Sequence, residues 1–314
     1  MENNNILKLK QQLYKEFEKY KINLNSKFII GVSGGPDSMW LLSLLKDLDI
    51  YVATVNYNKR EDAWKDQKIV EDYCKLNKIN YEVLVLKHEE NQKGNFQEIA
   101  RIERYDFYKK LYDKYGVDYL ILAHHKDDSL ETFLFQKQSN RQPRQYGILI
   151  NSQVSGMNIF RPMINLWYKS EIKDFCDKNK IEYAIDSTND QPIYTRNKIR
   201  IQLKKNTIEE KNILFNSMIN INNKLKEKFL VIDKEYFKFA KNNFNYKKIN
   251  LTHKYINEIL FLFIHKNTKN ITLSHNKIEL LKKFINSEKN YKMFKLSDHA
   301  FVYKEDSLLK IKEN

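Results

Sequence analysis

The chain has 314 residues, 42% of them hydrophobic, which is enough for about two domains with packed cores. Its net charge of +15 and its 20 Tyr and 18 Phe favour a polyanionic partner such as nucleic acid, although heavy use of Lys, Asn, Ile and Tyr also follows from an AT-rich coding sequence. Cys74 and Cys176 are far apart, and no apolar stretch approaches the ~20 residues of a membrane span. These features argue against a disulfide framework and a membrane partner, and they predict a cytoplasmic protein.

Short apolar runs alternate with longer helical patterns in the first half of the chain. The apolar runs predict strands at residues 28–32, 50–55, 81–86 and 118–123, and the patterns between them predict helices at 36–48, 61–77, 95–115 and 127–137. The helix over 95–115 opens with Asn95 and Glu98, close to a capping box, and closes at Gly116. Strands that alternate with helices in this way indicate an α/β protein with a doubly wound parallel sheet.

The pattern changes after about residue 204. Before that point we expect a loop over 136–156, a helix over 170–178 and a strand over 181–185. Beyond it, Lys- and Asn-rich helical segments run to residue 245, Thr252 and Ser274 are expected to cap two further helices, and residues 291–311 alternate like a small antiparallel hairpin. The sequence therefore predicts an α/β domain over residues 1–204 and a mainly helical domain over residues 205–314.

A Ser-Gly-Gly-Pro-Asp-Ser segment at residues 33–38 connects the first strand to the first helix. Its glycines let the backbone turn sharply and bring N–H groups close to a ligand, and Pro36 suits the first helical position. Together with the positive end of the helix dipole, this arrangement favours a phosphate. Asp37 would repel a phosphate, so its presence indicates a bound Mg²⁺ or an acid–base function.

A second polar segment, residues 124–132, joins the fourth strand to the next helix. Asp127, Asp128 and Glu131 fall at or near the first turn, where they either cap the helix or hold Mg²⁺ and orient a nucleotide. His124 and His125 are adjacent in an extended segment, so their side chains point to opposite faces. We therefore do not expect both histidines to bind one metal ion.

Both segments carry a resemblance to a known family. The loop at 33–38 resembles the pyrophosphate loop of the PP-loop ATPases, and the H-x-x-D-D-x-x-E-T pattern at 124–132 is similar to the second motif of the tRNA(Ile)-lysidine synthetases, a PP-loop family that acts on tRNA. Four more segments resemble motifs of that family in the same order: Val55-Asn56 with Arg60, N-x-x-E-x-A-R-x-x-R-Y at 95–105, Gly156-Met157 with Arg161-Pro162, and D-x-[ST]-N with R-N-x-I-R at 186–200.

One departure from the family pattern affects the expected site, in addition to Tyr57-Asn58-Lys59, which replace the usual His-Gly-Leu. The family usually has an Arg-Gly-Ser-Gly loop soon after the Glu-Thr pair, whereas residues 139–146 of this chain contain no glycine. A glycine-supported backbone contact at this place must be altered or absent. Arg141 and Arg144 either grip a phosphate by charge instead or are simply solvated.

The resemblance implies a PP-loop (adenine nucleotide α-hydrolase-like) fold and a ligase that forms a C–N bond. Such an enzyme joins free lysine to C2 of the wobble cytidine of tRNA(Ile) with a CAU anticodon. The cytidine is first adenylated, and AMP and pyrophosphate are released. ATP would be the co-substrate and Mg²⁺ the cofactor, and the Lys-rich helical domain would bind the body of the tRNA.

The resemblance also implies the residues of the site. Asp37 and Asp128 are the expected catalytic residues and Mg²⁺ ligands. The loop residues expected to bind ATP are Ser33, Gly34, Gly35, Pro36, Asp37 and Ser38. The residues expected to bind the other substrates are Arg60, Arg101, Arg104, His125, Asp127, Glu131, Asn189, Arg196 and Arg200. The alternatives are helix capping for Asp127, surface salt bridges for the first three arginines, and a structural role at the domain junction for the segment from Asn189 to Arg200.

Two other interpretations compete with this one. The first is another PP-loop enzyme, where the absence of a C-x-x-C motif disfavours a tRNA thiolase and the basic charge disfavours an amidating ligase of small molecules. The second is a non-catalytic tRNA-binding protein that keeps the fold. The presence of both Asp37 and Asp128 argues against this second interpretation.

Overall fold

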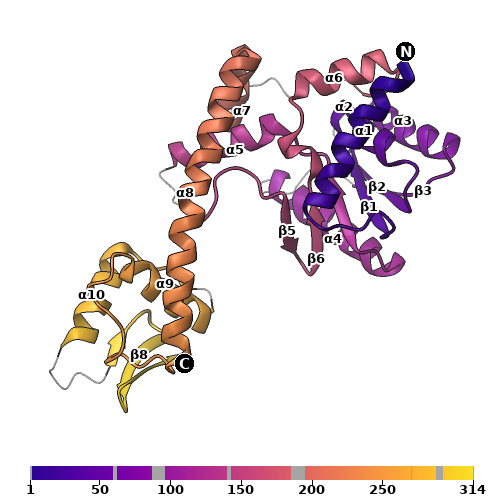
Figure 1. Cartoon of the computed structure of the whole chain (residues 1–314). Helices are drawn as coiled ribbons and strands as arrows, with labels where there is room; N and C mark the ends of the chain where they lie inside the picture. The colour runs from indigo at the N-terminus through magenta and orange to yellow at the C-terminus, as the bar shows by residue number, and fades with distance from the viewer. Residues whose placement is uncertain are drawn as a thin grey trace. The chain divides into compact units, whose positions relative to one another are not determined.

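The computed structural model describes residues 2–58, 62–86, 96–139, 143–184, 195–269, 271–287 and 293–313 (Figure 1). The chain forms two compact units, residues 1–219 and 220–314. The division between them falls inside helix α8 (Ile208–Lys241), later than the domain boundary that the sequence suggests near residue 205. No helix in the described ranges is long and apolar enough to cross a membrane.

The first unit is built on a six-stranded sheet with the order β3-β2-β1-β4-β6-β5. Neighbouring strands are parallel except for β5, which runs antiparallel to β6. The strands are β1 (Phe28–Val32), β2 (Ile50–Asn56), β3 (Asn80–Val85), β4 (Tyr119–Leu122), β5 (Asn151–Val154) and β6 (Met157–Phe160). The predicted doubly wound α/β fold is confirmed. Because β1 and β4 are parallel neighbours, the turns that follow them leave the same edge of the sheet side by side.

Helices cover both faces of this sheet, and successive residues of β1 face opposite layers. Phe28 and Ile30 pack into the larger core cluster, whereas Ile29 belongs to the cluster on the other face. The larger cluster includes residues of α1 (Glu2–Lys19), α2 (Pro36–Leu45), α3 (Ala63–Leu76) and α6 (Lys169–Lys178). The smaller cluster is closed by α4 (Phe96–Tyr115). The remaining helices of this unit are α5 (Lys126–Gln138), the 3-10 helix η1 (Pro162–Asn165), α7 (Thr195–Lys205) and the start of α8.

The second unit has its own core beneath a small sheet. It consists of the rest of α8, helices α9 (Ile256–Asn267) and α10 (His275–Asn286), and strands β7 (Met293–Lys295), β8 (Ala300–Glu305) and β9 (Leu308–Glu313). Leu260, Phe263, Leu281 and Val302 are buried in its centre. Ser274 caps α10, as predicted, because its Oγ accepts the N–H of Lys277 at 3.3 Å.

The expected hairpin at the end of the chain is confirmed as β7 and β8, which pair antiparallel, and β9 extends it to a three-stranded sheet. Other predicted elements are wrong. Thr252 does not cap a helix, since a turn intervenes and α9 begins only at Ile256. The expected loop over 136–156 contains β5, and residues 181–184 form no strand. The N–H of Ala184 instead donates to the carbonyl oxygen of Gly34 at 2.8 Å, which places this segment beside the loop at 33–38. The predicted N-cap Asn95 lies outside the described residues.

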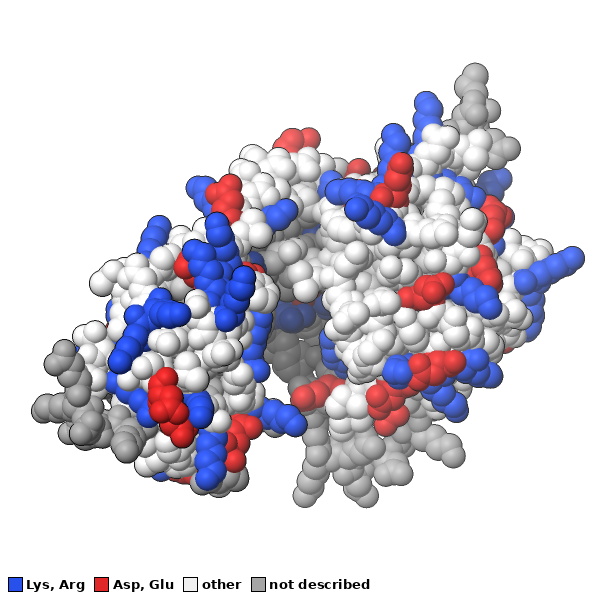
Figure 2. All heavy atoms as spheres, turned by 60° about the horizontal axis from the view of Figure 1, so that its bottom comes forward, with Lys and Arg blue, Asp and Glu red and all other residues white. Residues whose placement is uncertain are grey.

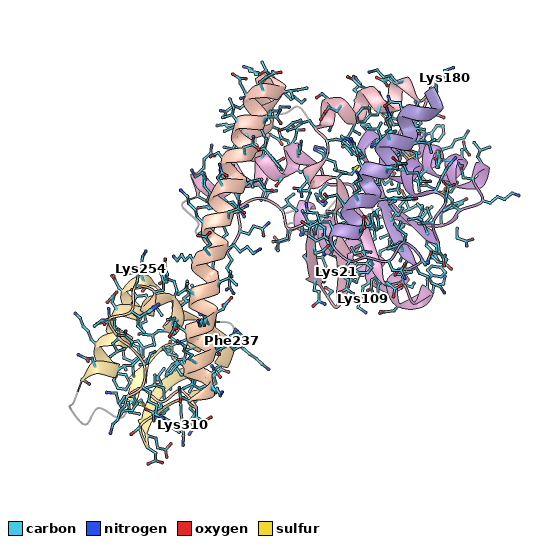
Figure 3. All side chains as sticks on the ribbon, viewed as in Figure 1. Lys21, Lys109, Lys180, Phe237, Lys254 and Lys310 are labelled. Atoms are coloured by element: carbon cyan, nitrogen blue, oxygen red, sulfur yellow. The ribbon has the colours of Figure 1, made fainter. Side chains whose placement is uncertain are left out.

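Basic charge is concentrated in the second unit. Residues 220–314 contain 20 Lys and no Arg against 10 Asp and Glu, which is +10 of the chain's net +15. All eight arginines lie between Arg60 and Arg200. Figure 2 shows basic side chains spread over the visible face of the second unit, and in Figure 3 Lys254 and Lys310 lie at its opposite ends. The charge of this unit is therefore distributed and carried by lysine alone.

Candidate active site

The loop at residues 33–38 is a tight turn held by its own serine side chains. Gly34 has a φ of +80°, and a Cβ at this position would lie 2.7 Å from the backbone oxygen of Asp66, so only glycine fits. Ser38 Oγ accepts the N–H of Ser33 at 3.1 Å and donates to the carbonyl oxygen of Gly35 at 3.0 Å. Helix α2 begins directly afterwards, at Pro36. The loop and the start of this helix together form a turn of the type that binds anions.

The two predicted catalytic carboxylates meet at one imidazole nitrogen. His125 Nε2 lies 3.6 Å from Asp37 Oδ1 and 3.5 Å from Asp128 Oδ2. Asp37 follows β1 and His125 follows β4, and the pairing of these strands brings their turns together. Asp128 Oδ2 also accepts the backbone N–H of His125 at 2.9 Å, which fixes the start of α5. Asp37 Oδ1 is buried and accepts no hydrogen bond from any described residue, so its nearest polar partner is the His125 ring.

The two adjacent histidines have opposite protonation behaviour. Burial opposes a charge on His125, but the nearby carboxylates of Asp128, Asp37 and Asp127 outweigh it and raise its pKa to about 9. Burial lowers the pKa of His124 to about 4, against the attraction of Asp128 and with the help of Arg161. At neutral pH, His125 is therefore a cation and His124 is neutral.

Asp127 differs from the other two aspartates because protein groups occupy both of its oxygens. Lys211 Nζ lies 2.7 Å from Oδ1, and the backbone N–H of Lys169 donates to Oδ2 at 2.7 Å. His125 Nδ1 lies 3.7 Å from the same Oδ2. Asp127 thus links the starts of α5 and α6 with α8. This geometry suits the structural alternative for Asp127 better than a direct contact with a substrate.

Glu131 and two arginines of α7 form a second cluster. Glu131 is 4% exposed, and its Oε2 accepts a hydrogen bond from Arg200 Nε at 2.6 Å. Arg196 Nη1 lies 3.6 Å from Glu131 Oε1, and its guanidinium is 4.9 Å from the centre of the Phe135 ring. About half of each arginine side chain stays exposed, at 52% for Arg196 and 46% for Arg200. One buried carboxylate therefore orients two guanidinium groups that can still reach an anion.

The remaining predicted substrate residues either make other contacts or lie outside the described residues. Arg104 Nη1 donates to Tyr57 Oη at 3.1 Å, and the guanidinium of Arg101 lies 5.0 Å from the ring centre of Tyr105. Both arginines belong to α4, and no contact joins them to the His125 cluster among the described residues. Arg60 and Asn189 lie outside the described residues.

Sequence reasoning missed two lysines that contact the aspartates. Lys211 lies on α8, about eighty residues after Asp127, and no spacing in the sequence connects the two. Lys169 Nζ lies 3.9 Å from Asp37 Oδ2, and 58% of this lysine side chain is exposed. Its ammonium group shows that a lysine-type cation fits beside the Asp37 carboxylate.

The described part of the chain contains no group of three or more His, Cys, Asp or Glu side chains arranged to hold a metal ion. Mg²⁺, however, is commonly bound by one or two carboxylates together with the phosphates of a nucleotide. The partly exposed carboxylates of Asp37 and Asp128 fit that type of site.

These features, a parallel sheet with an anion-binding Ser-Gly-Gly-Pro-Asp-Ser turn at its carboxyl edge, define a PP-loop ATP-binding domain. Residues 4–207 match the family model of this PP-loop domain. A U34-tRNA thiolase from Methanococcus maripaludis shares the fold, with a TM-score of 0.57 and 15% identity over 71% of this chain and 80% of that one.

Curated relatives narrow the family further. The chain is 43% identical over 284 residues to the tRNA(Ile)-lysidine synthase of Mycoplasmopsis pulmonis, covering 90% of this chain and 98% of that relative. It is 34% identical over 311 residues to the tRNA(Ile)-lysidine synthase of Mycoplasma mycoides, covering 94% and 76%. The chain belongs to the tRNA(Ile)-lysidine synthase family.

Proposed function

We propose that this enzyme joins lysine to C2 of the wobble cytidine of tRNA(Ile) with a CAU anticodon, at the expense of ATP. In the first step, the C2 oxygen of cytidine attacks the α-phosphorus of ATP and pyrophosphate leaves. In the second step, the ε-amine of lysine attacks C2, loses a proton and displaces AMP. The observation that carries this proposal is the pair of open carboxylates, Asp37 and Asp128, beside a phosphate-binding loop in a chain of this family.

The loop is suited to the first step. The backbone N–H groups at Gly34 and Gly35 and the start of α2 can stabilise the charge that develops as pyrophosphate leaves. The loop has no lysine of the P-loop type, so transfer of the γ-phosphate is not the expected chemistry. Mg²⁺, held by Asp37 or Asp128 together with the phosphates, would supply further charge neutralisation.

The charge balance of the cluster is suited to the second step. Lys211 neutralises Asp127, and the protonated His125 offsets only one of the two charges on Asp37 and Asp128. The second charge faces the exposed ammonium of Lys169, 3.9 Å from Asp37 Oδ2, which the ammonium of a substrate can replace. The approach of the Lys169 ammonium to Asp37 supports binding of the ammonium of a lysine substrate at this place. A carboxylate can then accept the proton that makes the amine nucleophilic.

We further propose that the two units divide the recognition of tRNA in a cytoplasmic enzyme. Guanidinium groups can make planar, bidentate contacts with phosphates and base edges, and all the arginines lie in the first unit. The second unit carries only lysines, which contact phosphates as point charges. This distribution supports chemistry and sequence discrimination in the first unit and binding of the tRNA backbone by the second.

The test is incorporation of labelled lysine into two transcripts of tRNA(Ile) that differ only at position 34, one with cytidine and one with uridine. We expect label in the CAU transcript alone, with AMP and pyrophosphate as the nucleotide products. Equal labelling of both transcripts, no labelling, or ADP as the main tRNA-dependent product would contradict the proposal. A tRNA(Met) transcript, which has the same anticodon, shows how far discrimination extends beyond the anticodon.

A further inference from the structure

The first turns of α8 contact the catalytic segment through four side chains on one side of the helix. Lys211 reaches Asp127, and the carboxamide oxygen of Asn212 accepts a hydrogen bond from Tyr168 Oη at 2.9 Å. The contacts of the next two turns continue toward the start of α5: Phe215 lies under the ammonium of Lys126 at 5.5 Å, and Met218 Sδ lies 3.8 Å from Ser129 Oγ. The spacing 211, 215 and 218 is that of one helix face.

Lys211 has the most costly environment of these four residues. Only 10% of its side chain is exposed, and its ammonium lies 2.7 Å from Asp127 Oδ1 and 5.6 Å from the centre of the Tyr168 ring. Burial of an ammonium group is unfavourable unless a partner compensates the charge. The partner here is a carboxylate whose second oxygen accepts the N–H of Lys169, and Lys169 directly follows Tyr168.

Asp127 stands next in the chain to Asp128, and its Oδ2 lies 3.7 Å from His125 Nδ1. Lys211 compensates the charge of Asp127 at Oδ1. Asp127 is thereby fixed between Lys211 and the N–H of Lys169, and the neighbouring His125 ring faces Asp37 and Asp128 through its other nitrogen, Nε2.

We propose that Lys211 is a positioning residue for the reaction: by neutralising and anchoring Asp127, it holds the start of α5, with His125 and Asp128, in its catalytic position. Lys211 itself contacts none of the reacting groups and acts through Asp127. The kinetic part of this inference rests on the proposed function, whereas its structural part does not.

The kinetic test uses two variants. Lys211→Met keeps the approximate length of the side chain and removes its charge, and Lys211→Arg keeps a cation at this position. We expect kcat for lysine transfer to fall about 10- to 100-fold in the Met variant, with the KM for ATP within about twofold of wild type, because the phosphate loop is untouched. The Arg variant should recover most of kcat. Lys173→Met, on an exposed position of α6, is the matched control and should behave as wild type.

A second substitution separates positioning from simple packing. Asp127→Asn removes the charge that Lys211→Met would leave buried and unpaired, so the double variant should be more active than Lys211→Met alone. If Lys211 only filled space, the asparagine would restore nothing. A kcat within twofold of wild type in Lys211→Met, or a double variant that is no better than Lys211→Met, would overturn the proposal.

Amide hydrogen exchange tests the same contact independently of activity. The N–H of Lys169 donates to Asp127, so its exchange should become on the order of tenfold faster in Lys211→Met, while amides in β1 keep their protection. Unchanged exchange at Lys169 would also overturn the proposal. If the wild-type enzyme transfers no lysine, the proposed function fails, and the exchange experiment still decides whether Lys211 positions this segment.

Discussion

The aspartates of this site differ in how many protein groups contact each carboxylate. Asp37 contributes a buried oxygen that accepts no hydrogen bond within the described residues and faces the His125 ring at 3.6 Å. Protein groups instead occupy both oxygens of Asp127. Two aspartates of the same site thus differ in their contacts because their surroundings differ.

Asp37→Asn tests the function of this open carboxylate. We expect lysine transfer to fall at least about 100-fold, because the amide neither accepts a proton nor binds Mg²⁺ as the carboxylate does. The folded state should persist, since the side chain keeps its shape and loses a buried charge. Activity is measured with the CAU transcript and folding by thermal unfolding, with Asp72→Asn on the exposed side of α3 as control. Lysine transfer at the wild-type rate would show that Asp37 is not catalytic.

The protonation of His125 predicts a pH dependence of stability. Its pKa in the folded protein is about 9, above the ordinary value of 6.5, so its charge stabilises the fold fully below pH 6.5 and this contribution is lost as pH rises through 9. The loss is on the order of 3 kcal/mol at most. Thermal unfolding without nucleotide and in EDTA should show a fall in the midpoint between pH 6.5 and 9 that is smaller in His125→Gln. Parallel pH profiles of the two proteins would contradict the assignment.

At the scale of elements, the phosphate loop depends on one backbone conformation. Gly34→Ala forces a Cβ against the backbone oxygen of Asp66, in addition to the strain of a positive φ. Gly116→Ala, at a φ of +57° with no atom within 4 Å of the added Cβ, introduces the strain alone. Urea unfolding should show a loss of about 1–2 kcal/mol for Gly116→Ala and a larger loss for Gly34→Ala. Only Gly34→Ala should weaken ATP binding, and equal effects of the two substitutions on ATP affinity would contradict this explanation of the loop.

The sequence predicts the central elements well because their signals are local. Phe28–Val32 is an uninterrupted apolar run, and the glycines and Pro36 after it mark the turn without reference to the rest of the chain. Helix α1 was not predicted because its composition is polar, although Leu13 and Phe17 carry its buried stripe. Strand β5 is short and polar, so only its pairing with β6 defines it.

The site residues that lie in recognisable motifs could be predicted from the sequence, whereas their partners outside these motifs could not. Pairing of β1 with β4 brings Asp37 to His125, and two adjacent parallel strands make this meeting predictable from the alternating pattern. The contact between Lys211 and Asp127 joins segments 84 residues apart, and it follows from the packing of α8, which no local pattern specifies. Long-range partners of this kind emerge only from the folded structure.

At the scale of the whole molecule, the Lys-only charge of the second unit predicts a strongly salt-dependent contribution to tRNA binding. Reversal of four exposed lysines should raise the KM for tRNA, leave that for ATP nearly unchanged, and lower the salt slope by about one unit for each lost phosphate contact. The four substitutions to Glu are at Lys224, Lys226, Lys247 and Lys248. Filter binding across a salt series is the measurement.

The matched control reverses four exposed lysines of the first unit, at Lys8, Lys15, Lys21 and Lys173. It changes the net charge of the chain by the same amount. If both variants lose tRNA affinity equally, net charge alone drives binding. If neither variant changes the affinity or the slope, the basic charge reflects composition only, and the second unit is a structural support.

Alkylation of the two cysteines can be used to measure local opening of the first unit, because both cysteines lie in that unit. Cys74 and Cys176 are fully buried, and burial raises the pKa of each thiol to about 12, so neither reacts with alkylating reagents until the surrounding structure opens. The second unit has no cysteine, and its unfolding leaves no trace in such an assay. Cys176 Sγ lies 3.5 Å from the carbonyl oxygen of Pro36, immediately behind the phosphate loop. The alkylation rate of Cys176 therefore measures how often the structure around the phosphate loop opens. Bound ATP should slow that rate in proportion to its occupancy.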